Sequence, residues 1–126
     1  MTKRLLVIDD EDGVREIIQI SLQTAAGWEV LSASSGSAGL AIAQTELVDA
    51  ILLDVMMPEQ DGISIFQQLQ IAPKTQSIPV IFLTAKARLS EQRQFVEVGA
   101  AGVIVKPFQA RDLVRQIEAI LGWRSH

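Results

Sequence analysis

The sequence predicts a doubly wound α/β domain, in which five parallel strands in the order 2-1-3-4-5 lie between layers of helices. Short apolar runs recur along the chain, and such runs are typical of strands buried on both faces. Segments with the apolar spacing of a helix alternate strictly with these runs. Strict alternation of strand and helix favours right-handed crossovers, and therefore a parallel sheet.

The composition indicates a globular protein of the cytoplasm. A length of 126 residues, 48% of them hydrophobic, fits one domain with a single core. The net charge of −4 argues against direct nucleic-acid binding through a basic face. The absence of cysteine excludes disulfides, thiol catalysis and thiolate metal sites. No apolar stretch approaches the roughly 20 residues that cross a membrane, and none has the form of a signal peptide.

The first half of the chain predicts three strands and two helices. The apolar run at 5–8 ends at a group of acidic residues, and the run at 50–53 ends at Asp54. Apolar residues on one helix face follow Gly13, and Gly27 is a typical helix stop. The predicted elements are strand 5–8, helix 14–25, strand 29–33, helix 35–44 and strand 50–54.

Proline and glycine mark the boundaries in the second half. Pro58 cannot continue a strand, and Pro79 can stand only at a strand start. Gly99 and Gly102 are predicted to bracket a turn. The helix at 90–98 is polar over its first half, which makes it weakly amphipathic and a natural mobile element. The predicted elements are helix 62–71, strand 79–83, helix 90–98, strand 103–105 and helix 113–121.

Four of the five predicted strands end in polar residues, which should converge at one edge of the sheet. Three clustered carboxylates would repel by up to about 4 kcal/mol per close pair at an effective dielectric of about 20. One lysine offsets part of this repulsion, and Mg²⁺, which prefers hard oxygen ligands, offsets more. The converging residues are Asp9, Asp10, Asp54, Thr84 and Lys106.

Taken singly, each of these residues has a structural explanation, such as a helix cap, a solvated charge or a surface lysine. That explanation is the favoured one for Glu11, as a cap of the first helix, and for Met56 and Met57, as gap-filling residues. It fails for the strand-end residues as a group, because chance gives no reason for them to sit at corresponding strand ends.

These motifs closely resemble the receiver domain of two-component response regulators, including the chemotaxis member. The resemblance covers essentially the whole chain and implies a single receiver domain over residues 1–126 with a flavodoxin-like, three-layer α/β/α fold. Any one motif is weak, but four in order are highly specific. They are LLVIDDE, ILLDVMMPEQDG, PVIFLTA and VIVKPF.

The resemblance also implies the chemistry. Asp54 would be the phosphoacceptor, attacking a phosphohistidine or a small donor such as acetyl phosphate. Lys106 would pair with Asp54 and then with the phosphoryl oxygens, which Thr84 would also bind. The expected Mg²⁺ ligands are Asp10, Asp54 and the backbone carbonyl of Met56, with Asp9 acting through water. The domain would catalyse its own phosphorylation and dephosphorylation without being a turnover enzyme.

The implied partners are proteins. A sensor histidine kinase or histidine phosphotransfer protein would supply the phosphoryl group, and a downstream protein or output domain would respond. Direct nucleic-acid and membrane contacts are not expected, and a phosphorylation-dependent homodimer is left open. The sequence also leaves open whether the chain is a stand-alone receiver or part of a larger protein.

One position departs from the family pattern. The family usually has Tyr or Phe three positions before the lysine, where this chain has Val103. In the usual switch a ring rotates inward behind the threonine, and valine has no ring. The change is therefore expected to travel through the Thr84–Arg88 loop and the helix after it.

Two alternative functions compete with the receiver. A haloacid-dehalogenase-type, Mg²⁺-dependent phosphatase also uses an Asp nucleophile at a strand end. Such enzymes carry a second Asp two positions later as general acid, and Met56 in that place argues against one. A receiver-like domain that is never phosphorylated is disfavoured, because the acceptor, the acidic pair, the threonine and the lysine are all present.

Overall fold

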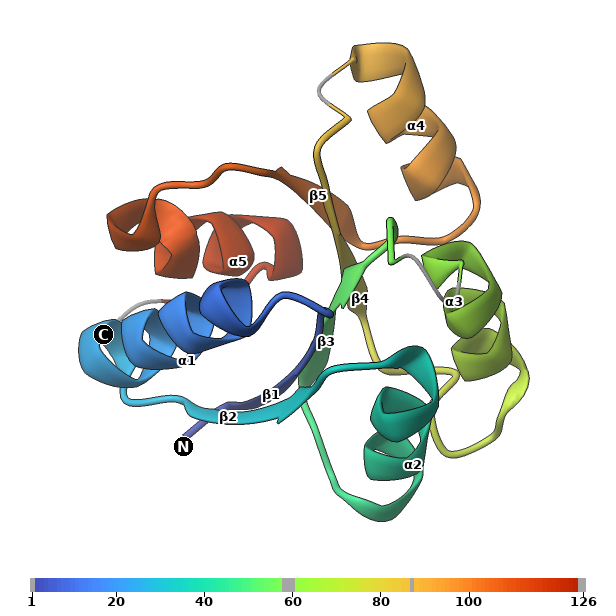
Figure 1. Ribbon diagram of the computed structural model, residues 1–126, viewed down its shortest axis with the longest axis horizontal. Helices are drawn as coiled ribbons and strands as arrows, with labels where there is room; N and C mark the ends of the chain where they lie inside the picture. Colours follow the sequence, from blue (N-terminus) through green and yellow to red (C-terminus); the bar gives the residue numbers. More distant parts are fainter. Residues whose placement is uncertain (1, 58–60, 87, 125–126) are drawn as a thin grey trace.

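A computed structural model describes residues 2–57, 61–86 and 88–124 (Figure 1). The sheet has five parallel strands in the order β2-β1-β3-β4-β5, which confirms the predicted fold class. Pro58 and Ala87 lie outside the described residues. The elements are β1 Arg4–Ile8, α1 Asp12–Ala26, β2 Glu29–Ala33, α2 Gly36–Thr45, β3 Ala50–Asp54, α3 Gly62–Ile71, β4 Val80–Thr84, α4 Leu89–Glu97, β5 Gly102–Val105, a 3₁₀ turn Ala110–Asp112 and α5 Leu113–Leu121.

Both faces of the sheet are buried, which is why its strands are apolar runs. Along β1, Leu5 and Val7 join a core cluster with α1 and α5. Leu6 and Ile8 point to the other face and join a cluster with α2 and α3. Figure 1 shows the same division, with α1 and α5 on one side of the sheet and α2, α3 and α4 on the other.

The strand register aligns the carboxyl ends of the central strands. The end of β1 pairs with β3 through Ile8 and Leu53, and the last residue of β3, Asp54, pairs with Leu83. Residues that follow these positions therefore emerge at one edge of the sheet. Backbone bonds continue just past the strand ends, where Val55 N–H donates to the Leu83 carbonyl (3.2 Å) and Lys106 N–H to the Thr84 carbonyl (2.7 Å).

Two of the boundaries that differ from the prediction involve glycine and proline. Gly102 is the first residue of β5 rather than part of a turn, and a Cβ there would lie 2.6 Å from a side-chain carbon of Ile120. The glycine thus allows α5 to pack closely on the strand. Pro79 directly precedes β4, and its carbonyl accepts a bond from Ile51 N–H at 3.0 Å.

Helix α4 is the most weakly buried helix of the described chain. None of its residues is buried, and the side chains of Leu89 and Val96 are 69% and 51% exposed. Its main anchor is Phe95, whose ring meets Phe82 edge-on with 5.2 Å between centroids. The low burial follows from the mostly polar sequence of α4. The prediction of weak amphipathicity was wrong, because the apolar residues of α4 are segregated to one side at least as well as those of α2 and α3. Across the described ranges, no helix is both long and apolar enough to cross a membrane.

Candidate functional site

The residues predicted to converge do meet at the carboxyl edge of the sheet. Asp9 follows β1 and is fully buried, Asp54 ends β3 and is 3% exposed, and Thr84 ends β4 and is also fully buried. Lys106 follows β5 and is half-buried, whereas Asp10 is exposed. A solvated Asp9 is therefore excluded by the structure, and the cluster has a buried floor with an open acidic rim.

The Lys106 ammonium is shared by three carboxylates. Its Nζ lies 2.7 Å from Asp9 Oδ2, 3.3 Å from Glu11 Oε1 and 3.4 Å from Asp54 Oδ2. The expected contact with Asp54 is present, but it is the longest of the three. Asp9 is the nearest partner, which the sequence did not predict.

Asp54 is held in place by its own turn as well as by the lysine. Its Oδ1 accepts the N–H of Met56 at 2.9 Å. Burial raises the pKa of the Asp54 carboxyl above its ordinary value, and the charge of Asp9 adds to this increase. The Met56 N–H and the Lys106 ammonium oppose it without cancelling it. The site therefore disfavours a negative charge at the very group that is expected to act as nucleophile.

The surroundings of Lys106 favour its charged form and raise its pKa. Burial acts to lower that pKa, but the hydrogen bond and charge of Asp9, with smaller contributions from Asp54 and Glu11, outweigh burial. The pKa of Lys106 is raised above its ordinary value as a result. The lysine is therefore a permanent cation at neutral pH.

The acidic cluster has the donor set of a divalent cation site. Oxygens of Asp9, Asp10, Glu11 and Asp54 all lie within 4.8 Å of one another. Among the described residues, Asp9 Oδ2 is the buried side-chain oxygen without a hydrogen bond, although Lys106 Nζ lies 2.7 Å away as an ion-pair partner. Hard, anionic oxygens gathered this closely fit Mg²⁺.

The interpretation of Glu11 as a helix cap needs correction. Glu11 does stand at the N-cap of α1, but within the described chain its side chain makes no capping hydrogen bond. It reaches Lys106 instead. The attraction of a nearby ammonium in the folded chain outweighs the local cap, because a glutamate is too long to cap its own helix well.

Arg15 is a residue of the site that sequence reasoning missed. Its guanidinium donates to the backbone carbonyl of Asp9 at 2.7 Å and pairs with Asp12. Arg15 thereby ties α1 to the loop that carries the acidic residues. An arginine one turn into the helix after an acidic loop is the sequence signal that could have suggested this contact.

Thr84 is not a cap of α4, whose N-cap is Arg88. Its Oγ1 accepts the N–H of Lys86 at 3.0 Å and so closes the turn that follows β4. Thr84 therefore couples the end of the central sheet to the segment that leads into α4.

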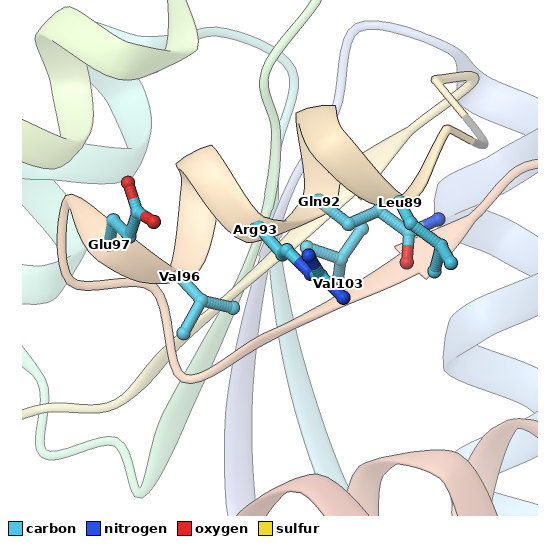
Figure 2. Close-up of a pocket in the computed structure, with 6 residues that line it drawn as sticks. All are labelled: Leu89, Gln92, Arg93, Val96, Glu97 and Val103. Carbon is cyan, nitrogen blue, oxygen red and sulfur yellow. The ribbon is translucent and has the colours of Figure 1, made fainter.

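Val103, which replaces the usual aromatic residue, lies in a groove between β5 and α4. The groove has a volume of about 350 Å³, and Figure 2 shows Val103 on β5 beneath the lining residues of α4. A larger side chain at this position would have room beside α4. The lining residues are Leu89, Gln92, Arg93, Val96, Glu97 and Val103.

Comparisons with known proteins agree on one family. The family model described as "Response regulator receiver domain" matches residues 5–118. The phosphate regulon transcriptional regulatory protein PhoB of Pseudomonas aeruginosa is 40% identical over 119 residues, which are 94% of this chain and 52% of the relative. The alkaline phosphatase synthesis transcriptional regulatory protein PhoP of Bacillus subtilis is 37% identical over 121 residues, 96% of this chain and 49% of the relative.

A solved structure extends the likeness to three dimensions. The chemotaxis response regulator CheY4 of Vibrio cholerae superimposes with a TM-score of 0.88 at 29% identity, covering 95% of this chain and 99% of that one. The chain spans about half the length of the curated relatives it matches.

Proposed function

We propose that this chain, which belongs to the response regulator receiver domain family, accepts a phosphoryl group on Asp54. A binding face of the protein would change in response. The observation that carries the proposal is the environment of Asp54. This buried carboxylate ends the central strand, with a cation at one oxygen, an N–H at the other and further carboxylates around it.

The transfer step is a substitution at phosphorus. A carboxylate oxygen of Asp54 attacks the donor phosphorus and forms an acyl phosphate, while the bond from phosphorus to the donor nitrogen or oxygen breaks. The electron pair of that bond leaves with the histidine or acetate. We expect Lys106, whose Nζ lies 3.4 Å from Asp54 Oδ2, to balance the charge of the phosphoryl oxygens, and Thr84 at the end of β4 to bind one of them.

The residues that would hold Mg²⁺ are Asp10, Asp54 and the carbonyl of Met56, with Asp9 acting through water. When bound, the ion would neutralise negative charge on the cluster and on the transferred group. The protein's own part is to hold four acidic oxygens close together, and Arg15 fixes the loop that carries three of them.

The partners follow from family membership. We propose a sensor histidine kinase or histidine phosphotransfer protein as the donor, in the cytoplasm. The matched curated relatives are transcriptional regulators roughly twice the length of this chain, which supports an output domain or downstream protein as the receiver of the signal. A homodimer formed on phosphorylation is a further candidate state.

The experiment that tests this function separates a switch from a phosphatase. Receiver domains are generally not turnover enzymes, whereas a haloacid-dehalogenase-type phosphatase releases product continuously. Incubation with p-nitrophenyl phosphate and Mg²⁺ should give no sustained release of nitrophenol. Acetyl phosphate should instead give one covalent phosphoryl group per chain. Steady turnover without a labelled protein would contradict the proposal.

A further inference from the structure

Glu11 is the exposed member of the three carboxylates that share Lys106. The Glu11 side chain is 61% exposed and that of Asp54 is 4% exposed, yet their oxygens lie at nearly equal distances from Nζ, 3.3 and 3.4 Å. The ammonium is thus attracted toward the solvent side of the cluster and toward the buried acceptor at the same time.

The backbone holds Glu11 in a position to do this. Its N–H donates to Asp9 Oδ1 at 2.9 Å, and its carbonyl accepts the N–H of Arg15 at 3.2 Å as α1 begins. The main chain of Glu11 is therefore fixed on both sides. The side chain does not cap the helix and is directed to Lys106.

We infer that Glu11 is a positioning residue for Lys106, which restrains the lysine from engaging the phosphoryl group on Asp54. This inference rests on the proposed function. A phosphoryl group adds a charge of about −1.5 to −2 and three acceptor oxygens next to Asp54. Lys106 must turn toward those oxygens, and a carboxylate that already binds its ammonium competes with them. Glu11 would thus weaken the phosphorylated state without touching the transferred group.

The solvent exposure of Glu11 sets the expected size of the effect of Glu11→Gln. Glu11 and Lys106 form a partly solvated pair, and such pairs contribute little individually. We expect Glu11→Gln to tighten binding of beryllofluoride, a phosphoryl mimic, about two- to five-fold at saturating Mg²⁺, and to raise the rate of phosphorylation by acetyl phosphate by a similar factor. Glu16→Gln is the matched control, since Glu16 is an exposed acid of α1 outside the described contacts of Lys106.

A double-mutant cycle separates positioning from general charge. Removing any nearby carboxylate favours an anionic ligand, and this contribution persists in a Lys106→Met background. The part of the gain in Glu11→Gln that acts through the Lys106 ammonium should be absent in the Lys106→Met background. The ¹⁵N signal of the Lys106 ammonium gives a second readout, which should shift in Glu11→Gln and not in Glu16→Gln.

The inference is overturned if Glu11→Gln matches Glu16→Gln, if its gain persists in Lys106→Met, or if phosphorylation slows. Should Lys106→Met bind too weakly to titrate, an unchanged ammonium signal in Glu11→Gln overturns the inference by itself. Failure of the proposed function looks different, because wild-type protein would then take up no phosphoryl group from acetyl phosphate.

Discussion

Asp54 lies in an environment that disfavours the negative charge of its carboxylate. Burial and the neighbouring Asp9 raise its pKa, and Lys106 and the Met56 N–H compensate only in part. A partly desolvated nucleophile surrounded by other acids is suited to a reaction in which a bound cation offsets the negative charge. The same arrangement makes the metal-free cluster self-repelling, and this has a measurable consequence at Asp10.

Asp10→Asn should weaken Mg²⁺ binding by about tenfold or more and stabilise the metal-free fold. The substitution removes the charge of one proposed ligand, and even groups that only support metal ligands typically contribute 10–100-fold to affinity. It also removes one carboxylate from the repelling cluster. Thermal melts in EDTA and across a Mg²⁺ series measure both effects, since a bound ion raises the melting temperature according to its affinity.

The control for Asp10 is Glu16→Gln, which removes an exposed acid of α1. Its melting temperature should respond to Mg²⁺ as that of wild type does. An equal response in Asp10→Asn would show that Asp10 is not a ligand.

At the scale of elements, the start of α3 supports the end of β3. A Cβ added at Gly62 would lie 2.4 Å from the Cα of Val55 and 2.6 Å from the backbone oxygen of Asp54. Both atoms belong to the backbone and cannot move as a flexible side chain can. Gly62 therefore permits a close approach of helix and strand at the backbone of Asp54, the proposed phosphoacceptor.

Gly62→Ala should cost about 1–3 kcal/mol of unfolding free energy, the usual cost of overpacking, and should slow labelling by acetyl phosphate, because the backbone of Asp54 must shift. Gly13→Ala is the matched control in the first turn of α1, where a Cβ would meet nothing within 4 Å. It should leave labelling unchanged and stabilise the fold by up to about 1 kcal/mol. Chemical denaturation and intact mass measure the two effects. Equal stability of both variants would contradict the packing argument.

At the scale of the whole molecule, phosphorylation of Asp54 would have to change a binding surface without an aromatic side chain at position 103, where this chain has valine. Thr84 closes the turn after β4, and this turn leads to α4, which is weakly buried. We therefore expect a change at Thr84 to shift α4. Moving an equilibrium from 1:99 to 99:1 needs about 5.5 kcal/mol of differential interaction. One new Thr84 bond to a charged oxygen contributes about 1.5–3 kcal/mol. Lys106 adds little, because it is already paired before phosphorylation.

The phosphorylated state should therefore remain a mixture at α4. NMR spectra with and without beryllofluoride should show intermediate shifts or exchange broadening for residues 86–98. Val103→Phe places a ring in the groove beneath α4 and should make the shift more complete. One sharp, fully displaced set of signals in wild type would contradict the prediction.

Strand ends could be predicted from sequence, because an apolar run terminated by a charge fixes where a buried strand stops. The convergence of Asp9, Asp54, Thr84 and Lys106 followed from that and from the strand order. The sharing of Lys106 with Glu11 did not, nor did the contact of Arg15. A long side chain can form several ion pairs of similar energy. Which of them forms depends on the folded geometry, and spacing along the chain does not reveal that geometry.

The most direct test of this account is the position of the phosphoryl group. Wild-type protein incubated with acetyl phosphate and Mg²⁺ should gain one hydroxylamine-sensitive phosphoryl group, read by intact mass. Asp61→Asn, which changes the N-cap of α3 to an equally good one, should be labelled in the same way. Asp54→Asn should gain none. Undiminished labelling of Asp54→Asn would contradict the assignment of Asp54 as the phosphoacceptor.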